Sequence, residues 1–161
     1  MPSARSVSEA VTYFFDSSAL IKLYHTKRGS QRVEAIFGEP DRRIMISRLT
    51  GVEFQSALAV KTRTGQLDPN AAAALRLRFL SDVASGAITS VAVSEHHYPT
   101  AESLILRYGD RKALRTLDAL QLAVVLETQN RLRLDALVVA DSTLAEVAQM
   151  QGLAVINPEV L

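Results

Sequence analysis

Short apolar segments alternate with longer helix-like segments along almost the whole chain, and this alternation restricts the fold more than any other feature. The strand-like segments are 12–15, 43–46, 88–93, 136–140 and 153–156. They are short and rich in β-branched or aromatic residues, as expected of buried strands. Strands that alternate with helices favour a parallel sheet covered on both faces. We therefore predict an α/β fold, a three-layer α/β/α sandwich with a mostly parallel central sheet.

The helix-like segments fill the intervals between these strands. They are 17–24, 29–37, 50–63, 70–84, 99–108, 116–128 and 141–150, and several end at a glycine, such as Gly86, Gly109 and Gly152. Glycine after the last helical residue and proline at the first turn are typical helix boundaries. We find no repeat, low-complexity stretch or linker. We therefore expect one domain over residues 1–161, in which residues 1–11 form a flexible N-terminal extension.

Composition limits the classes of protein that the chain can belong to. Of its 161 residues, 48% are hydrophobic and 22% are charged, which suits a folded domain with a real core. The net charge of +1 does not indicate a nucleic-acid binder, although it is compatible with a local basic patch. The absence of cysteine excludes disulfides, thiolate nucleophiles and thiolate-bound zinc. No apolar run is long enough for a signal peptide or a membrane span, so we expect a soluble cytoplasmic protein.

Four carboxylates lie where predicted strands end or where the next helices begin. Asp16 and Asp141 directly follow strands, Glu53 lies near the start of the helix after the second strand, and Asp118 lies in the first turn of the helix from residue 116. Sites in open α/β sheets form beyond the carboxyl ends of the strands. The positions after parallel strands project from one edge, so we expect Asp16, Glu53 and Asp141 to gather there. The helix of Asp118 leads into the fourth strand, so strand order alone does not assign Asp118 to an edge.

Each carboxylate also has an ordinary structural interpretation. Asp16 and Asp141 could be helix N-caps, and Thr50 with Glu53 fits a capping box. Asp118 could simply favour the positive end of its helix. Taken one at a time, capping is the commoner role for such residues.

Asp118 is the carboxylate that capping explains least well. Its helix is apolar nearly all round, which predicts burial. A buried carboxylate costs several kcal/mol unless it is paired or bound to a metal. Gln121, one turn further on, is a polar neighbour on the same face.

Four carboxylates at one edge repel each other unless a cation lies between them. All of these ligands are oxygen donors, and the three histidines, His25, His96 and His97, lie outside the acidic segments. Hard oxygen ligands suit Mg²⁺ or Mn²⁺. We interpret His96 and His97 as part of a solvated loop, because their spacing matches no metal-ligand pattern.

The segments that carry the acids resemble a known family. FDSSALIKLY at 15–24, ISRLTGVE at 46–53, LRTLDALQLA at 114–123 and VVAD at 138–141 are similar to the four acidic motifs of PIN domains. The closest resemblance is to the VapC-type toxins of bacterial toxin–antitoxin pairs, and it extends from residue 12 to residue 158. The segment 64–93 matches least well.

The resemblance implies a PIN-like α/β/α fold and a Mg²⁺- or Mn²⁺-dependent ribonuclease that acts as a toxin. By motif match, Asp16, Glu53, Asp118 and Asp141 would be the catalytic and metal-binding residues. Ser17, Ser18 and Gln121 would hold these carboxylates or a metal-bound water in position. The family also implies a homodimer and an antitoxin partner that blocks the site.

Basic residues near the acidic segments are candidates for contact with RNA. Lys22, Arg48 and Arg115 lie inside or beside the motifs, and Arg111 and Lys112 precede Asp118. A solvated helix end is the alternative interpretation of the stretch that contains Arg111 and Lys112.

Three other functions remain open at this point. A receiver-type regulatory module also places aspartates at strand ends, but it needs a late lysine, and no lysine follows Lys112. A PIN-like module that binds Mg²⁺ or RNA without cutting it would usually lack one of the acids. A DNA nuclease, a phosphatase or an RNA-processing nuclease outside a toxin–antitoxin pair could use the same acids.

Overall fold

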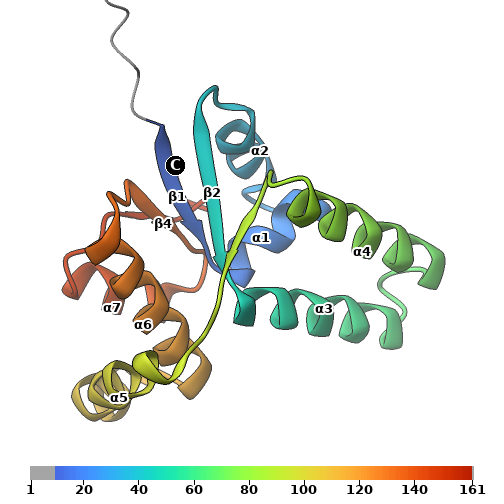
Figure 1. The fold of residues 1–161 in the computed structure, drawn as a ribbon. Helices are drawn as coiled ribbons and strands as arrows, with labels where there is room; N and C mark the ends of the chain where they lie inside the picture. The colour runs from blue at the N-terminus through green and yellow to red at the C-terminus, as the bar shows by residue number, and fades with distance from the viewer. Residues whose placement is uncertain (1–9, 161) are drawn as a thin grey trace, which may run out of the picture.

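The computed structural model describes residues 10–160, which form a five-stranded parallel sheet between two layers of helices (Figure 1). The strands are β1 (Val11–Phe15), β2 (Arg42–Ser47), β3 (Thr89–Val91), β4 (Ala136–Val138) and β5 (Val155–Ile156). Their order in the sheet is β3-β2-β1-β4-β5, and each neighbouring pair is parallel. The predicted three-layer α/β/α fold with a parallel sheet is therefore confirmed.

Helices cover both faces of this sheet. They are α1 (Ser17–Tyr24), α2 (Ser30–Gly38), α3 (Arg48–Arg63), α4 (Pro69–Ala84), α5 (Tyr98–Lys112), α6 (Thr116–Arg131) and α7 (Ser142–Met150), and a 3-10 turn spans Glu95–His97. In Figure 1, α5, α6 and α7 lie on one side of the sheet, and α1 to α4 lie on the other. None of the helices in the described part of the chain is long and apolar enough to cross a membrane.

Successive strand residues face opposite layers and so build two cores. Phe14 and Met45 pack with residues of α5, α6 and α7, whereas Phe15 and Ile46 pack with residues of α1 to α4. This alternation follows from the two-residue period of a strand. Because both faces are covered, the central strands read as continuous apolar runs, which is why the sequence predicted them.

An aromatic cluster joins α1, α3 and α4. The ring centroids of Tyr24 and Phe54 lie 5.1 Å apart, and those of Phe54 and Phe79 lie 4.6 Å apart. The Tyr24 hydroxyl also donates to Asp82 Oδ2 at 2.6 Å. These contacts fix α1 against α3, which matters because the two helices form the walls of the candidate site.

Three helix boundaries differ from the prediction by two residues or more, and one of them is the end of α6, which lies at Arg131 and not at residue 128. α3 begins at Arg48 because Ser47 Oγ accepts from the backbone N–H of Thr50 at 3.1 Å, so the predicted capping box of Thr50 and Glu53 is wrong. α5 continues through Gly109 and ends at Lys112, and the next residue, Ala113, adopts φ 54°. A single glycine in a helix costs only about 1 kcal/mol, which the packing of α5 outweighs.

At the N-terminus, β1 begins at Val11, within the segment predicted to be a flexible extension. Residues 1–9 of that extension lie outside the described residues. The amino end of β1 is held by Asp135, whose Oδ2 accepts from the backbone N–H of Thr12 at 2.8 Å.

Candidate active site

The fold brings the four predicted carboxylates to the carboxyl edge of the sheet, the lower edge in Figure 1. Asp16 follows β1 and caps α1, and Asp141 lies beyond β4 and caps α7. Glu53 lies in the second turn of α3 after β2, and Asp118 lies in the first turn of α6. The capping interpretation is therefore correct for Asp16 and Asp141, and Asp118 also accepts from the backbone N–H of Arg115 at 3.3 Å at the start of α6. Capping does not account for the convergence of all four.

Ser18 ties the ends of the two central strands together. Its hydroxyl donates to Asp16 Oδ2 at 2.6 Å and accepts from the backbone N–H groups of Ala140 at 2.9 Å and Asp141 at 3.3 Å. The backbone N–H of Ser18 also donates to Asp16 Oδ2 at 3.1 Å. One hydroxyl thus fixes Asp16 relative to the backbone that carries Asp141.

Gln121 holds the other oxygen of Asp16 from inside the protein. Its side chain is 1% exposed, and its Nε2 donates to Asp16 Oδ1 at 3.0 Å and to Thr50 Oγ1. Its Oε1 accepts from Ser47 Oγ. Ser47 and Thr50 are fully buried, and the sequence did not single them out as site residues because they read as ordinary helix-capping residues.

Glu53 and Asp118 lie in an environment that disfavours their charge. Burial raises the pKa of Glu53, and the nearby Asp16 and Asp118 carboxylates raise it further, against a hydrogen bond from Ser17 Oγ at 2.9 Å. Burial also raises the pKa of Asp118, to which the Asp141 charge adds, while Arg115 opposes the shift. The four acids therefore act on each other electrostatically at one site.

Glu53 and Asp118 open onto a groove of about 570 Å³ between α1, α3 and the start of α6, which we call the acid groove. Its lining residues are Ser17, Ser18, Ile21, Lys27, Glu53, Ser56, Ala57, Val60, Arg115, Thr116, Leu117 and Asp118. Asp16 is nearly buried beneath this groove. A substrate in the groove would meet Glu53 and Asp118 first.

Two of the predicted RNA-contacting residues lie at the carboxyl edge of the sheet. Arg115 is exposed, lines the acid groove, and its Nε lies 3.4 Å from Asp118 Oδ2. Arg48 is exposed at the start of α3. Both can reach an anion that approaches this edge.

The other three predicted RNA contacts lie elsewhere or are engaged. Lys22 is 4% exposed, and its ammonium contacts the Glu159 carboxylate and donates to the Arg28 carbonyl at 2.9 Å. Lys112 pairs with Glu146, whereas Arg111 is exposed near the end of α5. We therefore leave Lys22 out of the proposed RNA contacts, because a buried and paired ammonium has no free face for phosphate.

The donor set of the site fits a hard divalent cation. Within residues 10–160, no three Asp, Glu, His or Cys side chains are arranged as a ready-made metal cage. Asp16 and Asp141 are held by hydrogen bonds, while Glu53 and Asp118 face the groove. Carboxylate oxygens whose pKa is raised by burial and by each other are stabilised when a cation neutralises them. The chemistry of these residues therefore fits Mg²⁺ or Mn²⁺.

The histidines stay outside the site, but one of them is not solvated. His96 is exposed, as predicted, whereas His97 is 4% exposed. The His97 Nδ1 accepts from the backbone N–H of Ser94 at 2.9 Å, and its Nε2 contacts the Glu127 carboxylate. The prediction of a solvated loop is thus wrong for His97, which belongs to the 3-10 turn and contacts Glu127 of α6.

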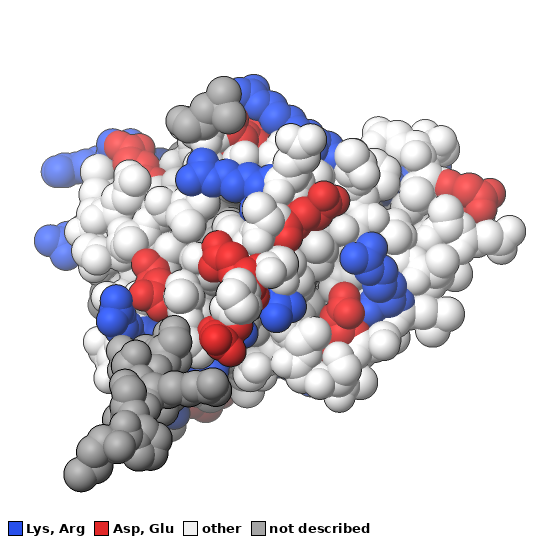
Figure 2. Space-filling view, turned by 90° about the horizontal axis from the view of Figure 1, so that it is seen from above, with Lys and Arg blue, Asp and Glu red and all other residues white. Residues whose placement is uncertain are grey.

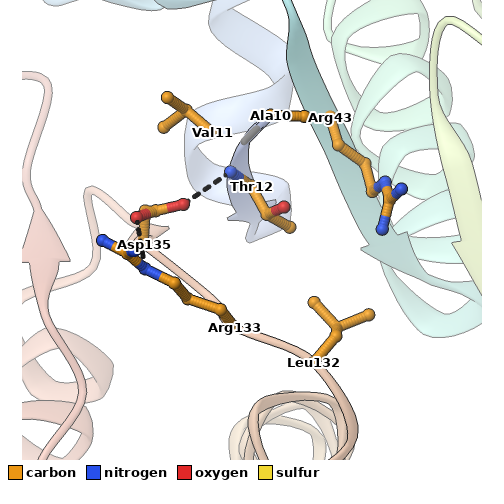
Figure 3. A pocket seen from close by; sticks show the side chains of 7 residues that line it. All are labelled: Ala10, Val11, Thr12, Arg43, Leu132, Arg133 and Asp135. Carbon is orange, nitrogen blue, oxygen red and sulfur yellow. Dashed lines mark hydrogen bonds and ion pairs between the residues drawn. The ribbon is translucent and has the colours of Figure 1, made fainter. Parts of the chain in front are cut away.

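The opposite edge of the sheet contrasts with the site. A hollow of about 270 Å³ lies there, lined by Thr12, Arg43, Arg133 and Asp135 among others (Figure 3). Arg133 Nε lies 3.3 Å from Asp135 Oδ1, so the carboxylate here is already paired. Figure 2 views this edge from above and shows acidic and basic side chains interspersed. Asp135 therefore accepts from the backbone N–H of Thr12 through Oδ2 and pairs with Arg133 through Oδ1.

Comparison with known proteins identifies the family. The PIN domain model matches residues 13–156, which is most of the chain. A comparison with curated proteins found no match. The chain belongs to the PIN domain family, whose members are nucleases.

Solved structures of the same fold cover nearly the whole chain. FitAcB from Neisseria gonorrhoeae is 16% identical with a TM-score of 0.65, and the match covers 92% of this chain and 99% of that one. VapC20 from Mycobacterium tuberculosis, described as a sarcin-ricin loop cleaving toxin, is 17% identical with a TM-score of 0.64 and coverage of 92% and 98%. A toxin–antitoxin complex from Klebsiella pneumoniae is 21% identical, with a TM-score of 0.57 and coverage of 92% and 99%. At these identities the likeness shows the fold.

Proposed function

We propose that this protein is a metal-dependent endoribonuclease that hydrolyses RNA phosphodiester bonds and acts as the toxin of a type II toxin–antitoxin pair. The observation that carries the proposal is the convergence of Asp16, Glu53, Asp118 and Asp141 at one edge of a PIN-domain sheet. The same four residues are the ones that the family's acidic motifs select.

All four acids would take part in binding the cation, some directly and some through water. Asp16 and Asp118 would hold the principal Mg²⁺ or Mn²⁺ ion, and Glu53 and Asp141 would complete its shell through water or hold a second ion. When bound, the ion lowers the pKa of a bound water and offsets charge on the phosphate oxygens.

The surrounding residues keep these acids in position. Gln121 and Ser18 each donate to one oxygen of Asp16, so its carboxylate cannot rotate freely. Ser17 does the same for Glu53. Arg115, beside Asp118 at the mouth of the groove, is placed to contact a phosphate oxygen. In-line attack by water would leave a 5′-phosphate and a 3′-hydroxyl, and no side-chain nucleophile is required.

The toxin role rests on similarity to solved toxin–antitoxin proteins and on the match of the acidic motifs. The proposal includes a homodimer, an antitoxin that covers the acid groove and an action in the cytoplasm. A small antitoxin gene next to this one would support it.

The experiment that tests the proposal is cleavage of a pool of structured RNAs by purified, antitoxin-free protein with Mg²⁺, with Mn²⁺ and with EDTA. DNA of the same sequences distinguishes a ribonuclease from a DNA nuclease. Asp16→Asn is the inactive comparison, and Glu102→Gln, an exposed acid on α5, is the matched control. We expect metal-dependent cutting of RNA that Asp16→Asn loses and Glu102→Gln keeps. Cutting that persists in EDTA would contradict the proposal.

A further inference from the structure

The acid groove has a basic end that the acidic motifs do not include. Lys27 lies in the loop after α1, is exposed, and lines the groove together with Ile21 of α1 and Val60 of α3. Glu53 and Asp118 line the other end. The groove therefore has acids at one end and a lysine at the other.

Lys61 of α3 follows Val60 and stands beside Lys27. Although the Lys27 side chain is exposed overall, partial burial of its ammonium lowers its pKa, and the Lys61 ammonium, in side-chain contact with it, lowers the pKa further. The same two lysines also lower the pKa of His25, which burial lowers first. Three basic side chains thus meet at this point.

Within residues 10–160, no carboxylate forms a direct ion pair with either lysine of this pair. The Lys61 Nζ donates to Gln66 Oε1 at 3.5 Å, and neither lysine forms an ion pair within residues 10–160. Glu159 acts electrostatically on Lys27, but its carboxylate is engaged by the Lys22 ammonium. Two ammonium groups in contact repel each other unless an anion binds between them.

The spacing between Glu53 and Lys61 along α3 indicates which phosphate of the RNA the lysine pair would bind. Lys61 lies eight residues after Glu53 on α3, which corresponds to about 12 Å along a helix. A phosphate held at the acids is therefore about two helical turns from the Cα of Lys61. The pair would have to bind a different phosphate of the same strand.

A second hollow continues the path beyond Lys27. It has a volume of about 690 Å³ and is lined by Lys27, Arg28, Ser30, Arg32 and Glu159 among others. Lys27 lines both hollows, so a chain that leaves the acid groove passes this side chain.

We propose that Lys27 and Lys61 form a phosphate-binding pair that holds single-stranded RNA at a nucleotide away from the scissile bond. The pair fixes the path of the strand along α1 and α3 and directs it toward Arg28. This inference rests on the proposed nuclease function for its substrate, but it concerns binding and not the chemical step.

The test measures RNA binding in the Asp118→Asn background, which prevents cutting. The probe is a fluorescein-labelled single-stranded RNA of about 12 nucleotides and mixed sequence, followed by fluorescence anisotropy. Binding constants are measured between about 50 and 200 mM salt. The variants are Lys27→Gln, Lys61→Gln and the pair together, and Arg43→Gln, an exposed arginine at the opposite edge, is the matched control.

We expect each lysine variant to reduce the slope of log K against log salt by about 0.7, and the double variant to reduce it by about 1.4. Arg43→Gln should leave the slope unchanged, and Lys27→Arg should preserve it. Thermal unfolding of Lys27→Gln should occur no lower than for the parent, because the substitution removes a repulsion.

An unchanged slope in the folded double variant would overturn the inference. Competition by a glutamate oligopeptide as strong as competition by unlabelled RNA would overturn the assignment to RNA. If the wild-type protein cuts no RNA but the slopes fall as expected, the nuclease proposal fails and the phosphate pair stands. If the protein cuts RNA but its slopes do not depend on the lysines, the nuclease proposal stands and the phosphate pair fails.

Discussion

Gln121 provides the sharpest test of how the site is held together, because it joins three elements through one buried side chain. Gln121→Leu keeps the volume of the side chain and removes three hydrogen bonds, those with Ser47, Thr50 and Asp16. The two hydroxyls lie 3.3 Å apart and can still bond each other. Asp16 Oδ1 loses the donor that Gln121 supplied.

The expected decrease in the free energy of unfolding follows from these lost hydrogen bonds. A hydrogen bond to a charged group contributes about 1.5–3 kcal/mol, and the weakened hydroxyl bonds add about 0.5–1 kcal/mol together. Part of this is offset by the apolar leucine, so we expect a net loss of about 2–3 kcal/mol. For a chain of this size, that loss lowers the Tm by about 4–12 °C.

The assay is urea and thermal unfolding of the metal-free protein, followed by circular dichroism. Gln129→Leu, an exposed position on the same helix, is the matched control and should change stability by less than about 0.5 kcal/mol. In a double-mutant cycle with Asp16→Asn, the double variant should lose less stability than the two single variants together. The difference in the free energy of unfolding should be about 1 kcal/mol or more. Additive losses, or a Gln121→Leu variant as stable as Gln129→Leu, would refute the reasoning.

Three further predictions concern the charges and strand ends of the site. Because burial raises the pKa of Asp118, its ionised form destabilises the metal-free fold at neutral pH, so Asp118→Asn should raise the Tm at about pH 7. The difference in Tm between Asp118→Asn and the wild-type protein should vanish as the pH falls below about 3.9, where the carboxyl is protonated in the unfolded chain as well. Equal Tm values of the two proteins at neutral pH would contradict this prediction. Mn²⁺ should raise the Tm of the wild-type protein more than that of Asp118→Asn, and equal shifts would count against a metal at these acids. Ser18→Ala should cost about 1–3 kcal/mol and speed hydrogen exchange at Ala140, because two backbone N–H groups lose their acceptor. Unchanged exchange would show that Ser18 does not join the strands.

The sheet and the positions of the acids could be predicted from sequence because both depend on patterns within short segments of the chain. Parallel strands buried on both faces are apolar runs, and Asp16 and Asp141 follow such runs directly. The end of α5 was missed because Gly109 reads as a helix terminator, while tertiary packing carries the helix to Lys112.

The polar network and the basic pair depend on contacts that no local pattern encodes. Ser47 and Thr50 resemble capping residues, and only the packing of α6 places Gln121 between them. Lys22 was expected at the surface, but its ammonium contacts the carboxylate of Glu159, which lies 137 residues further along the sequence. Lys27 lies in a loop and meets Lys61 only because α1 packs on α3.

The measurement that tests the central claim most directly is the rate at which one cleavable RNA is cut by the wild-type protein and by four single variants with Mn²⁺ present. The variants are Asp16→Asn, Glu53→Gln, Asp118→Asn and Asp141→Asn, with Glu102→Gln as the control. Loss of a few kcal/mol of metal-assisted stabilisation predicts that each variant is slower by about 100-fold or more while remaining folded. Variants that cut as fast as Glu102→Gln would contradict the assignment of these acids as the nuclease site.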